Sequence, residues 1–187
     1  MFADLPNSVE IREVGPRDGL QNETTIPVNE RIALIDALSA TGLTAIEAAS
    51  FVHPKAIPPM AGSAEVMKGI CRVPGVRYRA LVPNERGALD ALACDADELE
   101  VVMSISETHN RKNINMTPDE SVKQIIELTA LAHQEETPVE AILSTAFGCA
   151  YEGDISPARV AYYARRVLDE GSVDALSFGD TSGMATP

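Results

Sequence analysis

Two hydrophobic periodicities alternate along this 187-residue chain. Short runs rich in β-branched residues predict strands, and longer segments with apolar residues at every third or fourth position predict amphipathic helices. The predicted strands cover residues 9–15, 44–50, 77–82, 99–106, 139–146 and 174–180, and the predicted helices cover residues 28–41, 61–70, 84–93, 117–135 and 156–171. Strand–helix alternation of this kind implies a parallel sheet covered by helices.

Local signals support individual elements of this pattern. Thr117, Pro118 and Glu120 form a capping-box sequence at the start of the helix predicted for residues 117–135. The polar run ETHNRKNINM, residues 107–116, predicts a loop between the fourth strand and that helix. No linker or low-complexity stretch divides the chain, so we expect a single domain over residues 1–187.

A doubly wound sheet and a (β/α)8 barrel both fit the alternation, and the strand ends favour the barrel. Polar residues recur where strands end: Arg17, Asp18, Glu47, Ser50, Ser104, Ser106, Ser144, Thr145, Asp180 and Thr181. In a barrel these ends meet at one mouth, where active sites are built. An open sheet would spread them over roughly 25 Å, at about 4.8 Å per strand. The sequence therefore predicts an incomplete TIM-type barrel with about six βα units.

Charge, apolar runs and cysteine spacing indicate which classes of binding partner and which cellular location to expect. The net charge of −13 disfavours nucleic acid and anionic membranes as partners, because both would be repelled. No apolar run approaches the roughly 20 residues that cross a bilayer. The N-terminal segment reads as neither a secretory signal nor a transit peptide, and the three cysteines have no zinc-ligand spacing. We expect a reduced, cytoplasmic protein.

The densest group of reactive residues is GPRDGLQNE, residues 15–23. The Arg17 guanidinium can hold a carbonyl or carboxylate with two hydrogen bonds and can stabilise a developing oxyanion. The neighbouring Asp18 carboxylate can bind a divalent cation. The same pair can instead form an ion pair that pins a loop, and the residues alone leave both interpretations open.

The longer segment VEIREVGPRDGLQNE resembles the opening of the hydroxymethylglutaryl-CoA lyase family, which belongs to the metal-dependent barrels called DRE-TIM metallolyases. The RDG portion is shared with related synthases and aldolases, whereas GPRDGLQNE is far more specific to the lyases. Further segments agree in order and spacing, among them SISETHNRKNIN, STAFGCAYEG and SFGDTSGMATP. The resemblance extends from about residue 9 to the last residue, and it implies the fold and the activity of the family.

The resemblance also implies roles for individual residues. Arg17 would bind the acyl carbonyl of the substrate and stabilise the enolate, and Asp18 would bind Mg²⁺ or Mn²⁺. Glu47 is expected in a buried strand, where pairing with Arg17 is favoured over an unpaired carboxylate. The remaining implied residues, which line or support the pocket, are Gln21, Ser50, Asn113, Asp180 and Thr181.

The implied reaction is cleavage of 3-hydroxy-3-methylglutaryl-CoA, an acyl-CoA, to acetoacetate and acetyl-CoA, a step of leucine degradation and ketone-body formation. Two alternatives stay open. One is a related barrel that condenses or cleaves another acyl-CoA or a 2-oxo acid. The other is a truncated protein without catalytic activity.

This chain departs from the family in its histidines. The family takes two further metal ligands from a His-x-His on its seventh strand, whereas His53, His109 and His133 lie far apart here. We therefore expect only the N-terminal portion of the lyase, inactive alone, because one carboxylate does not make a magnesium site. Strands 1 and 6 would be unpaired edges, which favour association into a homo-oligomer, such as a dimer.

Three lesser expectations concern single residues. His53 is expected in a solvated loop, and His133 and Cys149 are expected to be structural. The basic residues Arg111 and Lys112, beside His109, either meet a CoA phosphate or remain solvated.

Overall fold

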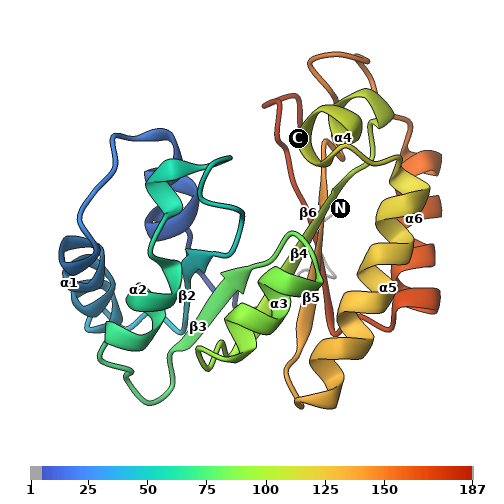
Figure 1. The fold of residues 1–187 in the computed structure, drawn as a ribbon. Helices are drawn as coiled ribbons and strands as arrows, with labels where there is room; N and C mark the ends of the chain where they lie inside the picture. The colour runs from blue at the N-terminus through green and yellow to red at the C-terminus, as the bar shows by residue number, and fades with distance from the viewer. Residues whose placement is uncertain (1–5, 187) are drawn as a thin grey trace.

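The six predicted strands form one parallel sheet in chain order, β1-β2-β3-β4-β5-β6, in a computed structural model that describes residues 6–186 (Figure 1). The strands are β1 Arg12–Glu13, β2 Ala45–Ser50, β3 Arg77–Leu81, β4 Glu98–Ser104, β5 Val139–Ser144 and β6 Ala175–Phe178. Every strand pairs in parallel with its neighbours in the chain. Consequently β1 and β6 are the two edges of this sheet within the described residues.

Helices connect the strands and lie on the outer face of the sheet (Figure 1). The α-helices are α1 Val28–Ser39, α2 Ser63–Gly69, α3 Glu85–Leu92, α4 Glu107–Ile114, α5 Pro118–Gln134 and α6 Pro157–Gly171. A π-helical turn, η1 Gly15–Gly19, and two 3-10 turns, η2 Leu20–Asn22 and η3 Pro58–Met60, complete the elements. Since α4 follows β4 at the upper end in Figure 1, that end is the carboxyl end of the strands.

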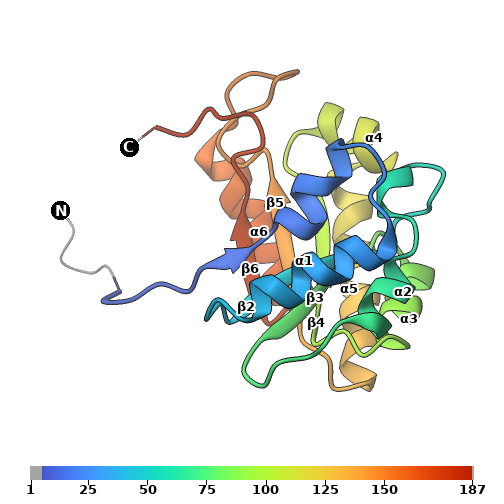
Figure 2. The same cartoon turned by 90° about the vertical axis from the view of Figure 1, so that its left-hand side faces the viewer.

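The sheet curls strongly (Figure 2). From β1, Nη1 of Arg12 donates to Oε1 of Glu100 in β4 at 2.9 Å and to Oε2 of Glu140 in β5 at 2.5 Å. A first strand cannot reach the fourth and fifth strands of a flat sheet, where each step between neighbours is about 4.8 Å. The curl confirms the predicted incomplete barrel and excludes the open doubly wound sheet.

The two faces of the sheet differ in chemistry, as β4 shows. Leu99, Val101 and Met103 are fully or almost fully buried and belong to the hydrophobic core under the helices. Because side chains alternate along a strand, Glu98 and Glu100 point to the opposite, concave side. Burial of each large apolar side chain contributes about 1.5–3 kcal/mol, so the outer layer stabilises the sheet by packing.

The predicted capping box at the start of α5 is confirmed. The Oγ1 atom of Thr117 accepts a hydrogen bond from the backbone N–H of Glu120 at 3.1 Å, and the Glu120 carboxylate accepts from the backbone N–H of Thr117 at 2.7 Å. Both groups would otherwise be unsatisfied at the helix start. Pro118 occupies the first turn, as expected.

The loop prediction for residues 107–116 is wrong, because Glu107–Ile114 form α4. Ser106 caps this helix by accepting a hydrogen bond from the backbone N–H of His109 at 3.1 Å. The fully buried Asn110 fastens it by accepting from the backbone N–H of Ser104 and donating to Oγ of Ser121, both at 2.7 Å. Polar contacts, rather than an apolar stripe, attach α4 to the rest of the protein. Hydrophobic periodicity therefore did not predict this helix.

The first strand is shorter than its predicted range, residues 9–15. Only Arg12–Glu13 pair with β2, and the chain then enters the π-helical turn of η1. The backbone N–H groups of Arg17 and Asp18 both donate to the Val14 carbonyl, at 3.1 and 2.7 Å. This turn ends the strand before Gly15 and carries the two reactive side chains.

Candidate active site at the carboxyl end of the sheet

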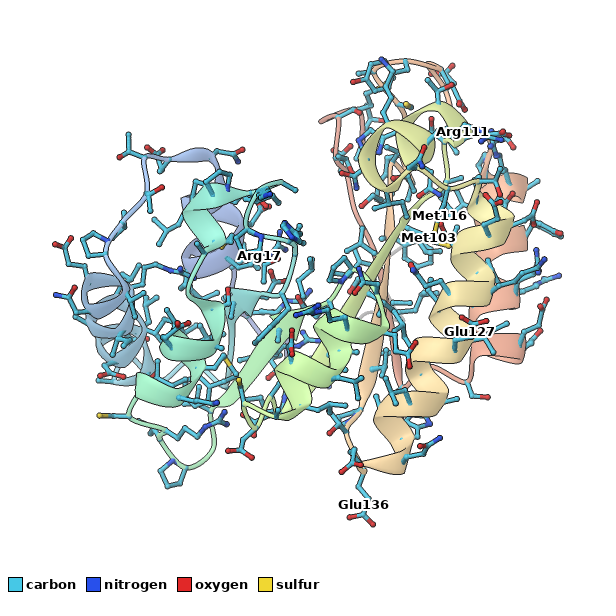
Figure 3. All side chains as sticks on the ribbon, viewed as in Figure 1. Arg17, Met103, Arg111, Met116, Glu127 and Glu136 are labelled. Carbon is cyan, nitrogen blue, oxygen red and sulfur yellow. The ribbon has the colours of Figure 1, made fainter. Side chains whose placement is uncertain are left out.

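The π-helical turn after β1 holds Arg17 near the carboxyl end of the strands, where Figure 3 labels it. Its side chain is only 12% exposed, so the guanidinium is directed into the protein. Nε of Arg17 donates to Oε2 of Glu47 at 2.7 Å, and Nη2 also contacts that oxygen. The expected pairing of Arg17 with Glu47 is thereby confirmed.

The third nitrogen of Arg17 faces the neighbouring carboxylate. Nη1 lies 2.9 Å from Oδ1 of Asp18, and that oxygen also accepts a hydrogen bond from Nε2 of Gln21 at 2.7 Å. Asp18 is 54% exposed, unlike Glu47, which is buried. Of the two interpretations left open by the sequence, the ion pair is present, and it sits at the barrel rim beside a buried carboxylate.

The other predicted pocket residues lie in three separate parts of the fold. Ser50 ends β2, three residues after Glu47, and its buried hydroxyl has no hydrogen-bond partner among residues 6–186. Asp180 and Thr181 form hydrogen bonds with backbone groups near the end of β6. The Asp180 carboxylate accepts from the backbone N–H groups of Met184 and Ala185. The Oγ1 atom of Thr181 accepts from the backbone N–H of Thr145 at 2.9 Å. Asn113 is exposed in α4.

The structure therefore assembles four of the predicted site residues into one hydrogen-bonded group. We call Arg17, Asp18, Gln21 and Glu47 the rim cluster. Within the described part of the chain, no hydrogen bond joins Ser50, Asn113 or Thr181 to the rim cluster, and their roles in binding substrate stay predictions.

The histidines and Cys149 lie outside the rim cluster. His53 is exposed, as expected, and Nε2 of His133 lies 2.9 Å from Oδ2 of Asp174, an arrangement consistent with its expected structural role. His109 lies within α4, where Nδ1 is 2.7 Å from Oγ of Ser104, and burial lowers its pKa. Cys149 is buried, and its thiol donates to Oγ of Ser106 at 3.1 Å.

Comparison with known proteins agrees with this geometry. The model of the family described as HMGL-like matches residues 8–187. Mouse mitochondrial hydroxymethylglutaryl-CoA lyase is 45% identical over 98% of this chain, and the Bacillus subtilis lyase is 47% identical over 97% of it. This chain belongs to the HMGL-like family.

Solved structures of HMG-CoA lyases have the same fold. The crystal structure of the Bacillus subtilis enzyme superposes with a TM-score of 0.94 over 97% of this chain. An Acinetobacter baumannii HMG-CoA lyase in complex with coenzyme A and 3-methylmalate gives a TM-score of 0.91 at 41% identity over 95% of this chain. The chain spans 56% of the mouse relative and 61% of the Bacillus relative, so it corresponds to a little over half of these family members.

The described residues offer one of the metal ligands that the family resemblance implies, the carboxylate of Asp18, and its role stays a prediction. Residues 6–186 contain no group of three or more His, Cys, Asp or Glu side chains placed to hold a metal ion. Asp18 is the exposed carboxylate of the rim cluster, but a Mg²⁺ ion requires a near-octahedral oxygen shell and gives up water reluctantly. These residues alone therefore do not fit a metal centre.

A second group of charged residues fills the concave side of this HMGL-like sheet, and sequence reasoning missed it. We call it the interior network: Arg12 of β1, Arg79 of β3, Glu98 and Glu100 of β4, Glu140 of β5 and Ser177 of β6. Arg79 contacts all three carboxylates, with Nε 3.2 Å from Oε1 of Glu100, and Ser177 donates to Glu140. The alternation of charged and apolar residues in β3 and β4 was the available signal.

Crowding of carboxylates shifts proton affinities in the interior network. Burial, with the adjacent charge of Glu47, raises the pKa of Glu100 to about 10, and burial with the charge of Glu140 raises the pKa of Glu98 to about 7. Burial alone would lower the pKa of Arg12, but the carboxylates of Glu100, Glu140 and Glu47 outweigh it and raise that pKa. Glu100 is therefore protonated at neutral pH, whereas Arg12 is charged.

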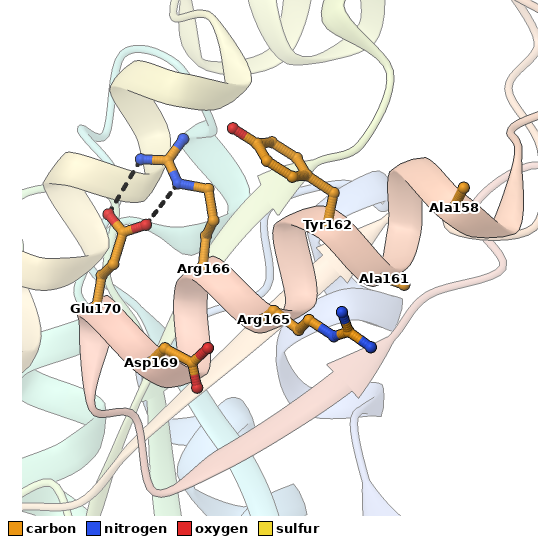
Figure 4. Close-up of a pocket in the computed structure, with 7 residues that line it drawn as sticks. All are labelled: Ala158, Ala161, Tyr162, Arg165, Arg166, Asp169 and Glu170. Carbon is orange, nitrogen blue, oxygen red and sulfur yellow. Dashed lines mark hydrogen bonds and ion pairs between the residues drawn. The ribbon is translucent and has the colours of Figure 1, made fainter.

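Two surface hollows lie away from the rim cluster. One, of about 450 Å³, follows the outer face of α6 beside Tyr162 and the Arg166–Glu170 ion pair (Figure 4), and it brings together no group suited to catalysis. The other, of about 610 Å³, lies beside α4 and includes Arg111 and Lys112. Contact of these residues with a CoA phosphate stays a prediction. No helix among the described residues is long and apolar enough to span a membrane.

Proposed function

We propose that this chain provides the substrate-activating half of a carbon–carbon lyase that cleaves 3-hydroxy-3-methylglutaryl-CoA to acetoacetate and acetyl-CoA. The observation that carries the proposal is the rim cluster, in which a buried glutamate holds the guanidinium of a largely buried arginine at the carboxyl end of a curled parallel sheet. In barrel enzymes this end carries the active site. Membership of the HMGL-like family supports the same reaction class.

In the proposed reaction the C3 hydroxyl loses its proton and becomes the ketone of acetoacetate. The C2–C3 bond breaks, and its electron pair moves onto the thioester to form the enolate of acetyl-CoA. Protonation at C2 then gives acetyl-CoA. The step that this chain serves is the second, because negative charge develops on the thioester oxygen and a fixed guanidinium stabilises such charge.

Each member of the rim cluster has a distinct part in that step. Arg17 binds the thioester oxygen with the nitrogen that otherwise contacts Asp18, while Glu47 keeps Nε fixed. Gln21 orients the Asp18 carboxylate, which would supply one ligand to a divalent cation, Mg²⁺ or Mn²⁺, if the rest of the ligand set were present. A bound cation would polarise the C3 oxygen.

Two further parts of the proposal concern assembly and location. The exposed edges β1 and β6 favour pairing with additional strands or with a second copy, because unpaired edges are templates for association. We place the protein in the cytoplasm, as in the zebrafish lyase named cytoplasmic, which is 48% identical, although the mouse relative is named mitochondrial. Sedimentation and cell fractionation test these two statements.

The decisive experiment compares two proteins in a lyase assay with hydroxymethylglutaryl-CoA and Mg²⁺. One is the 187-residue chain, and the other is a hybrid that continues with the part of the Bacillus subtilis lyase beyond its matching region. We expect acetoacetate from the hybrid only, because the chain alone has one candidate metal ligand. A folded hybrid without lyase activity would refute the proposed function.

A further inference from the structure

The Glu47 carboxylate lies between two arginines, one on each of its oxygen atoms. Oε2 accepts from Nε of Arg17 at 2.7 Å, on the side of the rim. Oε1 lies 3.6 Å from Nε of Arg12, on the side of the barrel interior. Glu47 is therefore the residue through which the rim cluster and the interior network meet.

The guanidinium of Arg12 is held by carboxylates of the interior network. Its Nη1 atom donates to Glu100 at 2.9 Å and to Glu140 at 2.5 Å, leaving Nε directed to Glu47. These carboxylates belong to β4 and β5, the middle of the curled sheet. The position of the Arg12 guanidinium is thus determined by three strands other than its own.

The guanidinium of Arg12 is a second cation beside Glu47, and it matters most when Arg17 binds substrate under the proposed function. A carboxylate that is only 2% exposed is costly unless it is paired. Under the proposed function the guanidinium of Arg17 is shared among Glu47, Asp18 and the substrate oxygen, so its charge is divided. A cation on Oε1 keeps the Glu47 carboxylate paired and in place while that sharing changes.

We propose that Arg12 is a positioning residue: it holds Glu47 from inside the barrel, and through Glu47 it fixes the direction of the Arg17 guanidinium. The inference rests on the proposed function for its catalytic meaning, since Arg17 must be the group that meets the substrate. Its structural content, the dependence of Arg17 on Arg12, is tested without turnover.

The test follows the Nε–Hε group of Arg17 by nuclear magnetic resonance in the 187-residue chain, with the signal assigned by its loss in Arg17→Lys. In Arg12→Gln we expect hydrogen exchange at this group to become at least about ten-fold faster, because the charge-assisted bond to Glu47 loosens. Arg12→Lys is the sharper variant: a lysine keeps the charge opposite Glu100 and Glu140, but its single nitrogen cannot also face Glu47. It also serves if Arg12→Gln fails to fold.

Arg79→Lys is the matched control, because Arg79 pairs with Glu98, Glu100 and Glu140. Although Arg79 lies beside Glu47 in the pairing of β3 with β2, no ion pair or hydrogen bond joins the two side chains among residues 6–186. We expect it to leave exchange at Arg17 as in the unmodified chain. Unchanged exchange in folded Arg12 variants, or equal acceleration in Arg79→Lys, would overturn the inference, since the effect would then be absent or merely general loosening.

In the hybrid, Arg12→Gln and Arg12→Lys should each lower kcat about ten-fold with little change in KM, because neither side chain can hold Glu47 as Arg12 does. An effect confined to KM would count against a role in directing Arg17. If the unmodified hybrid has no activity, the proposed function fails while the exchange measurement still decides whether Arg12 positions Arg17.

Discussion

The rim cluster and the interior network are built from the same chemical groups, arginines and carboxylates, in opposite surroundings. The rim cluster takes three of its four residues from one short segment, and Asp18 faces solvent with 54% exposure. The interior network takes its residues from five strands, and its glutamates are 10% exposed or less. Surroundings therefore decide what the groups do: at the rim a guanidinium can meet a ligand, whereas inside the sheet the charges bind one another.

Crowding and burial also explain why the pKa values of Glu98 and Glu100 in the interior network are raised. The exposed Asp18 carboxylate accepts hydrogen bonds from Arg17 and Gln21, whereas Glu98, Glu100 and Glu140 crowd around Arg12 and Arg79 on the buried concave side of the sheet. Desolvation penalises the charged form of an acid, and neighbouring negative charge adds to the penalty. The interior network accordingly holds a proton on Glu100 at neutral pH.

The largest expected effect falls on stability and comes from the interior network. Arg79→Leu should lower the free energy of unfolding by about 3–5 kcal/mol, because it removes from three buried glutamates an arginine that contacts all of them. Urea-induced unfolding at pH 7 measures the loss, with Arg86→Leu as the control at a side chain that is 92% exposed. Equal stability of Arg79→Leu and the unmodified chain would show that the carboxylates take up protons instead, and that the ion pairs contribute little.

The next effect falls on activity and comes from the rim cluster. Arg17→Gln in the hybrid should lower kcat by about 10²–10³-fold, because under the proposed function it removes the charge that stabilises the enolate oxygen. The readout is the initial rate of acetoacetate formation, with circular dichroism to establish folding. Arg72→Gln, at a surface arginine paired with Asp97, is the control. If kcat fell by a similar factor in both variants, the result would contradict a catalytic role specific to Arg17.

A smaller effect concerns the pH dependence of stability and comes from Glu100 in the interior network. The pKa of Glu100 is about 10 in the folded chain against an ordinary value of 4.5, so between these values unfolding releases a proton and stability falls as pH rises. Glu100→Gln should remove this contribution, which has a slope of about 1.4 kcal/mol per pH unit. Urea unfolding at pH 6 and pH 8 measures the slope.

Glu127→Gln is the control for that measurement, because Glu127 is exposed on α5 (Figure 3). Its pH dependence should match that of the unmodified chain. If Glu100→Gln also keeps the original slope, Glu100 is ionised in the folded protein and the description of the interior network is wrong.

The smallest effect is expected at the exposed acid of the rim. Asp18→Asn should change the free energy of unfolding by less than about 0.5 kcal/mol, because exposed ion pairs contribute little to stability. The same variant in the hybrid should lose activity through its missing metal ligand. A large loss of stability in Asp18→Asn would mean that the Arg17–Asp18 pair serves the fold, as the alternative interpretation of the sequence held.

Much of the fold and part of the site could be predicted from the sequence. Strand–helix alternation indicated the six βα units, and the contiguous run GPRDGLQNE indicated Arg17 and Asp18. The one missed helix, α4, is held by the cap at Ser106 and the buried Asn110, which leave no apolar stripe to detect. The predicted Arg17–Glu47 pair followed from the cost of a lone buried carboxylate.

The sequence by itself determined the features that depend on residues close together in the chain. Hydrophobic periodicity specified most of the strands and helices, and turn and cap residues specified where several of them begin. Only the tertiary structure decided which charges meet inside the sheet, because curling brings β1 against β4 and β5, and so places Arg12 on Glu100 and Glu140. These contacts join residues 88 and 128 positions apart. Their pairing depends on which face of the sheet each strand gives its alternate side chains and on how far the sheet curls, and both are fixed only in the folded chain.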